Sequence, residues 1–370
     1  MIPILLSITI IIGVYFIELK KNVQHHCSFI LSMFFFFFLM GGNYQNADYD
    51  AYRYSYYNSS FENVNFAYWA YNLSMYFFST LGISFISYRL LLYAIGLIFI
   101  SFTVKKVSGP NLLFSFFYFL YPMIIDATQM KNFLAMSIFS FALTFLSENL
   151  LGKIKYTILL LLAGGFHIAI FAFFPLVIFK NFILSKNLRY FFIPFIFIAA
   201  LFMSTMGANS VLLNYLSSLM INDFADKQSL YFNQSVNYGF LIYFFATTLN
   251  FFVVCKARKI IKASTYTNDF QKKFSEIVYM CSIYSFLFFP LYMFRLEFSR
   301  IFRDLFIVIN CLVALALCIQ TYDGRYLTLS RDKIELGICH IILLGILYYF
   351  GIHEAYDSVV QPLFLYNIFY

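Results

Sequence analysis

The stretch YRLLLYAIGLIFISFTV, residues 88–104, is followed at once by Lys105 and Lys106. A helix that crosses a membrane needs about 20 mostly apolar residues, with a range of about 17–25. The stretch reaches this length, and its basic flank is typical of a helix end on the cytoplasmic side. Working outward from it, we predict ten crossings, near 2–18, 26–42, 88–104, 111–126, 131–147, 189–206, 238–255, 275–294, 301–320 and 334–352.

Composition supports the same fold class. The chain has 370 residues, of which 62% are hydrophobic and only 11% charged, whereas a soluble domain carries roughly 25% charged residues. Lysine and arginine fall in short connections between apolar runs, so the net charge of +8 indicates membrane orientation and not nucleic-acid binding. We therefore predict an all-α, polytopic transmembrane helical bundle that forms a single integral membrane domain, residues 1–370.

The polar connections set the expected topology. Residues 43–87 and 207–237 are predicted to be extracytoplasmic loops. A full span at 156–179 would place more basic residues outside than inside, against the positive-inside rule. We therefore predict a re-entrant or broken helix pair there, with its tip at Ala163-Gly164-Gly165-Phe166-His167, where two glycines can break a helix. In an alternative topology, 67–82 is a span and 156–179 crosses the membrane as one helix. The positive-inside rule disfavours this topology only by a small margin.

The first group of candidate site residues lies in the first polar connection. Carboxylates, an arginine and tyrosines alternate there, and tyrosine rings and acids are suited to sugars, while an acid can also act as a base. The alternative is a solvated loop with interfacial tyrosines. The candidates are Asp48, Tyr49, Asp50, Tyr52, Arg53 and Tyr54.

Two further groups flank apolar runs. Gln129, Lys131 and Asn132 stand where the 131–147 helix begins, and a cation beside free backbone N–H groups is suited to phosphate; the alternative is a lysine that snorkels to the membrane surface. His167 follows the predicted helix break and could position a hydroxyl or donate to a phosphate oxygen. Alternatively, it is a satisfied core residue.

The fourth group lies where a span turns at the outer face, although the positive-inside rule disfavours arginine there. It comprises Arg295, Glu297, Arg300 and Arg303. Guanidinium groups match phosphate oxygens with two parallel hydrogen bonds, so a diphosphate is the expected ligand. Internal ion pairing is the alternative.

The sequence contains no Walker A loop, Rossmann glycine fingerprint, HExxH or GxSxG. Asp48-Tyr49-Asp50 has the D-x-D spacing of metal-dependent nucleotide-sugar transferases, but we expect it outside, where nucleotide sugars are absent. We therefore predict no metal site and no cofactor.

The order of these motifs resembles the EpsG family of Wzy-type polysaccharide polymerases. The resemblance rests on Lys20-Lys21, on Asp48-Tyr49 with Tyr52, and on Met130-Lys131-Asn132-Phe133-Leu134-Ala135, which is similar to an Ile-Arg-Gln-x-Leu-Ala-like motif. It also rests on Ala163–His167 and on the arginine-aromatic segment 295–303. Lysine at 131 and asparagine at 132 depart from the usual arginine and glutamine, and lysine loses the bidentate geometry.

The resemblance implies a multi-pass glycosyltransferase of the bacterial inner (cytoplasmic) membrane. It would join oligosaccharide repeat units carried on undecaprenyl diphosphate at the outer leaflet, giving O-antigen, capsule or exopolysaccharide. The expected partners are this lipid-linked oligosaccharide, the lipid bilayer, a chain-length regulator and a flippase, and no nucleic acid.

Within this hypothesis Arg295, Arg300 and Arg303, with Lys131, would hold the departing diphosphate. Asp48 or Asp50 would orient or deprotonate the acceptor hydroxyl, with His167 as second candidate, and the tyrosines would line the sugar path. Three alternatives share parts of this chemistry: a lipid-linked oligosaccharide flippase, a membrane O-acyltransferase and a polysaccharide ligase. A flippase should show two pseudo-symmetric halves, which this sequence lacks.

The predicted topology can be tested with reporter fusions. Fusions within 43–87 and near residue 128 should report the periplasmic or external side, and fusions after Lys21 and Lys106 the cytoplasmic side. If the segment around 126–132 reports the cytoplasm, the predicted function is wrong, because assembled repeat units are not joined there.

Overall fold

The computed structural model describes residues 8–15, 26–64, 68–109, 111–146, 149–177, 239–294, 298–319, 330–352 and 355–369. Within these ranges the chain is helical, without a β-strand of more than an isolated bridge between Asn43 and Asn367. The prediction of an all-α helical bundle is confirmed. The predicted crossing at 189–206 and the loop 207–237 lie outside the described residues.

Four helices in the described ranges are long and apolar enough to cross a membrane: Phe85–Val107 (α5), Phe240–Ala263 within Gly239–Ala263 (α14), Ser299–Cys318 (α17 with α18) and Arg331–Ile352 (α19). Two shorter apolar helices are His26–Gly42 (α2) and Met130–Leu143 (α8). Two predicted crossings are instead divided into shorter pieces. The run 111–126 forms Leu112–Leu120 (α6) and Met123–Asp126 (α7), and 275–294 forms the end of Asp269–Tyr284 (α15), a short 3₁₀ turn and Phe289–Phe294 (α16).

Side-chain caps explain where several helices begin. Ser84 accepts a hydrogen bond from the backbone N–H of Ser87 at the start of α5, and Asn149 accepts one from Gly152 at the start of Leu150–Phe166 (α9). Asn268 and Gln271 form a reciprocal capping box on α15. Each cap satisfies an N–H that has no partner within its own helix.

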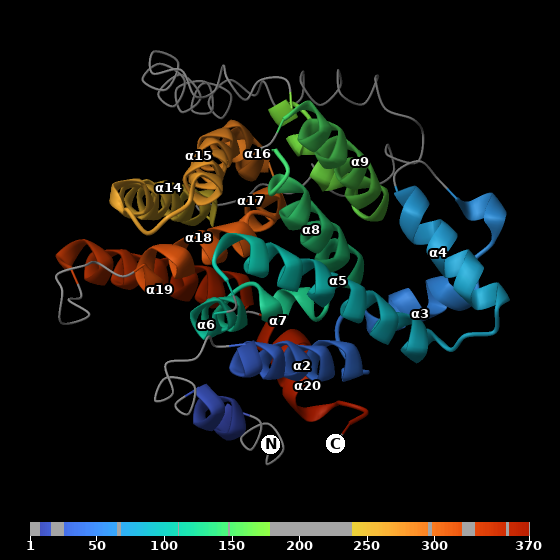
Figure 1. Ribbon diagram of the computed structural model, residues 1–370. Helices are drawn as coiled ribbons and strands as arrows, with labels where there is room; N and C mark the ends of the chain where they lie inside the picture. Colours follow the sequence, from blue (N-terminus) through green and yellow to red (C-terminus); the bar gives the residue numbers. More distant parts are fainter. Residues whose placement is uncertain are drawn as a thin grey trace.

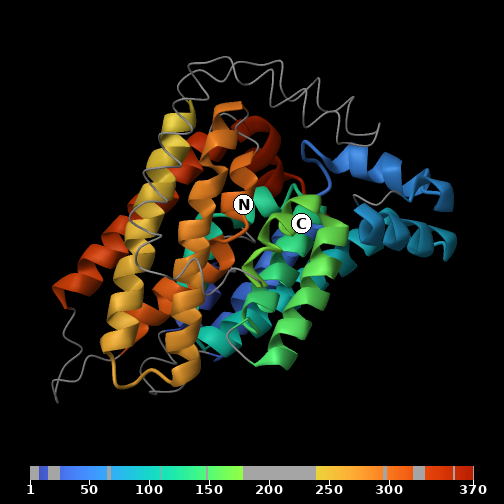
Figure 2. The same cartoon turned by 90° about the horizontal axis from the view of Figure 1, so that it is seen from above.

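In Figure 2, the yellow and orange helices α14 and α15 form one side of the bundle, and the green helix α9 lies on the other. Tyr49–Tyr57 (α3) and Trp69–Thr80 (α4) lie beside the N-terminal end of α5, at the edge of the molecule (Figure 1). The predicted loop 43–87 is thus largely helical. Ser299–Arg303 (α17) leads into Phe306–Cys318 (α18), which occupies the interior.

One end of the bundle gathers basic residues, and we call it the basic end. The Lys106 ammonium lies 4.0 Å from the ring centre of Phe145 and 5.2 Å from that of Phe270. Gln271 donates to the carbonyl of Val107 at 2.9 Å. These contacts bring together the end of α5, the segment after α8 and the start of α15. The opposite end, where α5 and α8 begin, is the site end.

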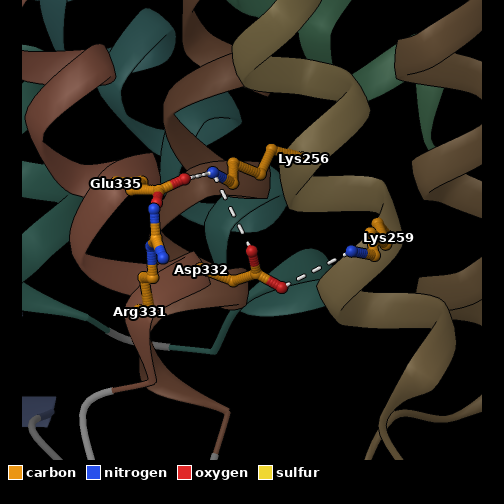
Figure 3. A network of polar contacts seen from close by, with 5 residues as sticks. All are labelled: Lys256, Lys259, Arg331, Asp332 and Glu335. Atoms are coloured by element: carbon orange, nitrogen blue, oxygen red, sulfur yellow. Dashed lines mark hydrogen bonds and ion pairs between the residues drawn. The ribbon is translucent and has the colours of Figure 1, made fainter.

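At the basic end, α14 and α19 are joined by a network of charges (Figure 3). Lys256 pairs with Glu335 and lies 3.9 Å from Asp332, and Lys259 lies 3.6 Å from Asp332. Arg331 pairs with Glu335 at 2.8 Å. Because these groups are partly exposed, each pair contributes little to the free energy of unfolding. The network sets the register of the two helices more than it stabilises them.

The predicted break near 163–167 is confirmed, but it falls at His167, and the two glycines expected to break the helix lie within its last turn. Helix α9 ends at Phe166, His167 is extended, and a 3₁₀ helix follows at Ile168–Phe173 (η3). The chain then doubles back, since the Tyr156 hydroxyl, in the middle of α9, donates to the carbonyl of Phe173 at 3.0 Å.

Glycine is required at this break because other groups approach the backbone closely. The ring of Phe171 packs where a side chain at 164 would begin, and Trp69 and Ala70 of α4 do the same at Gly165. A side chain at either position would push η3 or α4 away from α9. The two glycines therefore set the packing of the site end.

Gly165→Ala should destabilise the protein. Overpacking costs about 1–3 kcal/mol, which outweighs the gain of about 1 kcal/mol in helix propensity. The matched control is Gly345→Ala in α19, where no atom lies within 4 Å of the added methyl group. Thermal unfolding of the detergent-solubilised protein should show a lower midpoint for the first variant and an equal or higher one for the second. Equal midpoints for Gly165→Ala and wild type would contradict this packing.

Candidate functional site at the end of the bundle where the helices break

Members of all four sequence groups lie at the site end. The beginning of α8 supplies Lys131, the break after α9 supplies His167, and α17 supplies Arg300 and Arg303. Helix α3 closes the site from the side. It is held in place by Tyr56, whose hydroxyl donates to the carbonyl of Ile83 at 2.7 Å.

Lys131 stands in the first turn of α8, where backbone N–H groups lack helical partners. Its ammonium lies 4.1 Å from the ring centre of Tyr68 and 6.0 Å from that of Tyr71. It also lines a groove of about 440 Å³ between α3 and α4. We call this the Lys131 groove, and its walls include Tyr52, Asn58, Tyr68, Tyr71, Asn72 and Lys131.

Helix α3 turns Asp48 and Tyr52 toward these cations, since residues four apart share one face of a helix. Arg300 and Lys131 both act on the Asp48 carboxyl. Burial raises the pKa of Asp48, and the two positive charges offset only part of that effect. Asp48 is thus a carboxyl that is partly stripped of water and placed beside two cations.

His167 is held between α9 and η3 and is 8% exposed. Its Nδ1 accepts from the backbone N–H of Ala169 at 3.4 Å, and its ring meets Tyr68 edge-on at 6.3 Å. A neutral imidazole whose Nδ1 accepts carries its proton on Nε2, which can then donate to a substrate oxygen. The charges of Lys131, Arg300 and Arg303 all act on this ring.

Beneath these groups lies a buried polar layer. Arg303 is 4% exposed and donates through Nη2 to Oε1 of Gln129 at 2.6 Å. The carboxylate of Asp126 accepts from the hydroxyl of Tyr118 at 3.0 Å. Arg303 acts as countercharge to both Asp126 and its neighbour Asp304. The layer fixes α17 against the start of α8 and so orients the cationic groups above it.

A family model matches residues 26–368, which is nearly the whole chain. The chain belongs to the EpsG family. This family includes Wzy-like polysaccharide polymerases, so the chain is a polysaccharide polymerase-type membrane protein. No curated protein and no solved structure matches it.

The other predicted site residues lie in different parts of this EpsG family member. Tyr54 is 73% exposed and borders the Lys131 groove. Tyr49, Asp50 and Arg53 face away from Lys131 and line a different pocket. Arg295 and Glu297 lie outside the described residues. Asn132 is 2% exposed and belongs to the buried layer. Within the described ranges, no group of three or more His, Cys, Asp or Glu residues is placed to hold a metal ion.

Three residues of the candidate site were not predicted from the sequence. Tyr68 and Tyr71 lie in the amphipathic stretch at 67–82, whose alternation of aromatic and polar residues was the available signal. Arg89 is a charge within an apolar run, which marks a candidate by default. It is 3% exposed, lies 5.4 Å from the ring centre of Tyr49, and donates to the carbonyl of Met40 at 2.8 Å.

The electrostatics of Asp48 predict a stability change. Because its pKa is raised in the folded state, its ionised form destabilises the fold at neutral pH, and this penalty disappears as the pH falls and the carboxyl is protonated. Asp48→Asn should therefore raise the thermal midpoint at pH 7 by a few degrees at most, with a smaller gain in acid. Asp50→Asn, at an exposed carboxylate, is the control and should leave the midpoint unchanged at both pH values. A lower midpoint for Asp48→Asn at pH 7 would contradict the burial effect.

Proposed function

We propose that this protein polymerises undecaprenyl-diphosphate-linked oligosaccharide repeat units into a surface polysaccharide, at the outer face of the bacterial cytoplasmic membrane. One observation carries the proposal. Lys131, Arg300 and Arg303 come from segments about 170 positions apart and act on one histidine, beside a carboxyl and an aromatic groove.

The cations suit the leaving group. Breaking the bond between a sugar and a diphosphate leaves negative charge on the phosphate oxygens, and fixed positive groups stabilise that charge as it develops. Arg300 can bind two phosphate oxygens at once, while Lys131 contributes a point charge at a helix N-terminus. Arg303, predicted from the sequence as a further phosphate ligand, lies instead in the buried layer, where its bond to Gln129 holds α17 and so positions Arg300.

Asp48 suits the incoming group. In the proposed step, a hydroxyl oxygen of the next repeat unit forms a bond to the anomeric carbon of the growing chain. The bond from that carbon to the diphosphate oxygen breaks, and the lipid diphosphate departs with the bonding electron pair. The hydroxyl proton passes to the Asp48 carboxylate, whose partial desolvation strengthens it as a base. The Nε2–H of His167 would orient an oxygen of either substrate.

The Lys131 groove suits a glycan. Tyrosine rings offer flat apolar faces to the C–H groups of a sugar, and the amides of Asn58 and Asn72 offer hydrogen bonds to its hydroxyls. Its volume of about 440 Å³ lies within the usual range of about 300–1,000 Å³ for ligand sites. The groove would hold the sugars nearest the diphosphate.

The arrangement of charge supports the outer leaflet. In the described ranges, lysines and arginines of the short connections gather at the basic end, which the positive-inside rule places in the cytoplasm. The candidate site lies at the opposite end of α5 and α8, where assembled repeat units are delivered.

Arg300→Gln should abolish or strongly reduce polymerisation, because losing one electrostatic stabiliser of a developing charge costs about 10²–10³ in rate. The measurement is the ladder of surface glycan on a gel, in a deletion strain that expresses the variant at normal level. The expected pattern is single repeat units attached to their acceptor. The control is Arg331→Gln at the basic end, where the side chain is 93% exposed, and it should give the wild-type ladder.

Other patterns would overturn the proposal. If deletion of the gene leaves no repeat units outside, the protein acts as a flippase. If it leaves full-length polymer without acyl groups, the protein is an acyltransferase. A wild-type ladder from Arg300→Gln at normal protein level would show that Arg300 does not stabilise a departing diphosphate.

A further inference from the structure

A second pocket lies on the other side of helix α3 at the same end of the molecule. It has a volume of about 520 Å³, and its polar walls are formed by Tyr44, Gln45, Tyr49, Asp50 and Arg53. Ile86 and Ile368 complete it. We call it the Tyr44 pocket.

Helix α3 separates this pocket from the Lys131 groove. Tyr49, Asp50 and Arg53 fall on one face of the helix, because positions three and four apart are neighbours on a helical surface. Asp48 and Tyr52 fall on the opposite face, toward Lys131 and Arg300. One short helix therefore presents two sets of tyrosine and carboxylate groups in opposite directions.

The walls of the Tyr44 pocket are anchored to the bundle. The backbone N–H of Tyr44 donates to the carbonyl of Tyr366 at 3.2 Å, and that of Ile368 donates to Gly42 at 2.9 Å. The amide of Asn43 donates to the carbonyl of Pro362 at 2.7 Å. The segment after α2 and the end of the chain are thus joined by backbone pairing. A pocket built on such a frame is formed before any ligand arrives.

The chemistry of the pocket matches a neutral or weakly charged sugar. Tyr44 is 42% exposed, so its ring is accessible to a ligand, and it packs edge-on against Tyr366 at 6.2 Å. Asp50 and Arg53 are exposed, and together with Gln45 they offer both acceptors and donors for hydroxyl groups. A single carboxylate beside a single guanidinium leaves no net charge to attract a diphosphate. The pocket is therefore suited to the glycan and not to its lipid diphosphate carrier.

We infer that the Tyr44 pocket binds sugar residues of the growing polysaccharide at a distance from the reacting bond. This inference rests on the proposed polymerase function. A polymer that has grown beyond the Lys131 groove is held by its lipid diphosphate and by the sugars next to it. A second contact on the far side of α3 retains the chain between successive additions, so that long products form before release.

The inference predicts a change in product length without loss of bond formation. In the deletion strain, Tyr44→Ala and Arg53→Gln should shift the glycan ladder to chains at least twofold shorter, while products of two or more repeat units persist. Asp50→Asn, an isosteric change at an exposed position, should shift it in the same direction and tests the pocket if Tyr44→Ala fails to fold. Glu62→Gln is the control, since it removes another exposed carboxylate at the site end and should leave the ladder unchanged.

Direct binding completes the test. Oligosaccharide of two or three repeat units, released from its lipid by mild acid, is titrated into the purified full-length protein in detergent. The pocket variants should bind it at least tenfold more weakly than wild type, and Glu62→Gln equally well. Unchanged chain length in all three variants would overturn the inference. So would shorter chains with unchanged oligosaccharide binding, which would assign the pocket to a chain-length-regulating protein.

Failure of the inference is distinguishable from failure of the proposed function. Arg300→Gln reports on the reacting centre and abolishes or strongly reduces polymerisation if the proposed function is right. The Tyr44 pocket variants alter only the length of the polymer. A normal ladder in Arg300→Gln overturns the function, whereas a normal ladder in the pocket variants overturns the inference alone.

Discussion

A backbone carbonyl freed by a helix break cannot turn to water within a membrane, and leaving it unpaired costs several kcal/mol. The protein meets this constraint with side chains. Asn310 donates to the carbonyl of Tyr121 at 3.0 Å, and Tyr93 donates to that of Ala127 at 2.7 Å. At the second break, Tyr284 donates to the carbonyl of Ala172 at 2.8 Å. The rest of the structure depends on these pairings, because they allow helices to stop inside the bundle.

The stopped helices create the site. The break between α6 and α8 lets a new helix begin at Met130 and places Lys131 in its first turn, and the break after Phe166 places His167 opposite it. Arg89 links the end of α2 to the segment just before α8, since it donates to the carbonyls of Met40 and Ala127. The same constraint that makes broken helices expensive therefore concentrates free N–H groups, charged side chains and tyrosines in one place.

The buried polar layer explains how positive charge is kept at this end. Arg303 is surrounded by Gln129, Asp126 and Asp304, so its charge is balanced within the protein. A buried charge is tolerated when it is paired and hydrogen-bonded. Arg300 and Lys131 lie nearer the surface and remain within reach of a ligand, and helix α3 adds a carboxyl on one face and a second pocket on the other.

The sequence by itself determined the fold class and the polar groups that carry chemistry, because apolar runs of spanning length act locally. It also indicated the region of the helix break, although Gly164 and Gly165 remain helical and serve the packing of Phe171 and Trp69. The sequence also indicated at which end of the bundle the candidate groups gather, because Lys105 and Lys106 mark the opposite end. Only the tertiary structure decided that Asp48 and not Asp50 faces the cations, and that Tyr68 and Tyr71 complete the groove. The reason is that the direction in which a side chain points depends on the rotation of α3 and on contacts with segments far away in the sequence, such as those of Lys131 with Tyr68 and of Asp48 with Arg300, and local pattern carries no information about either.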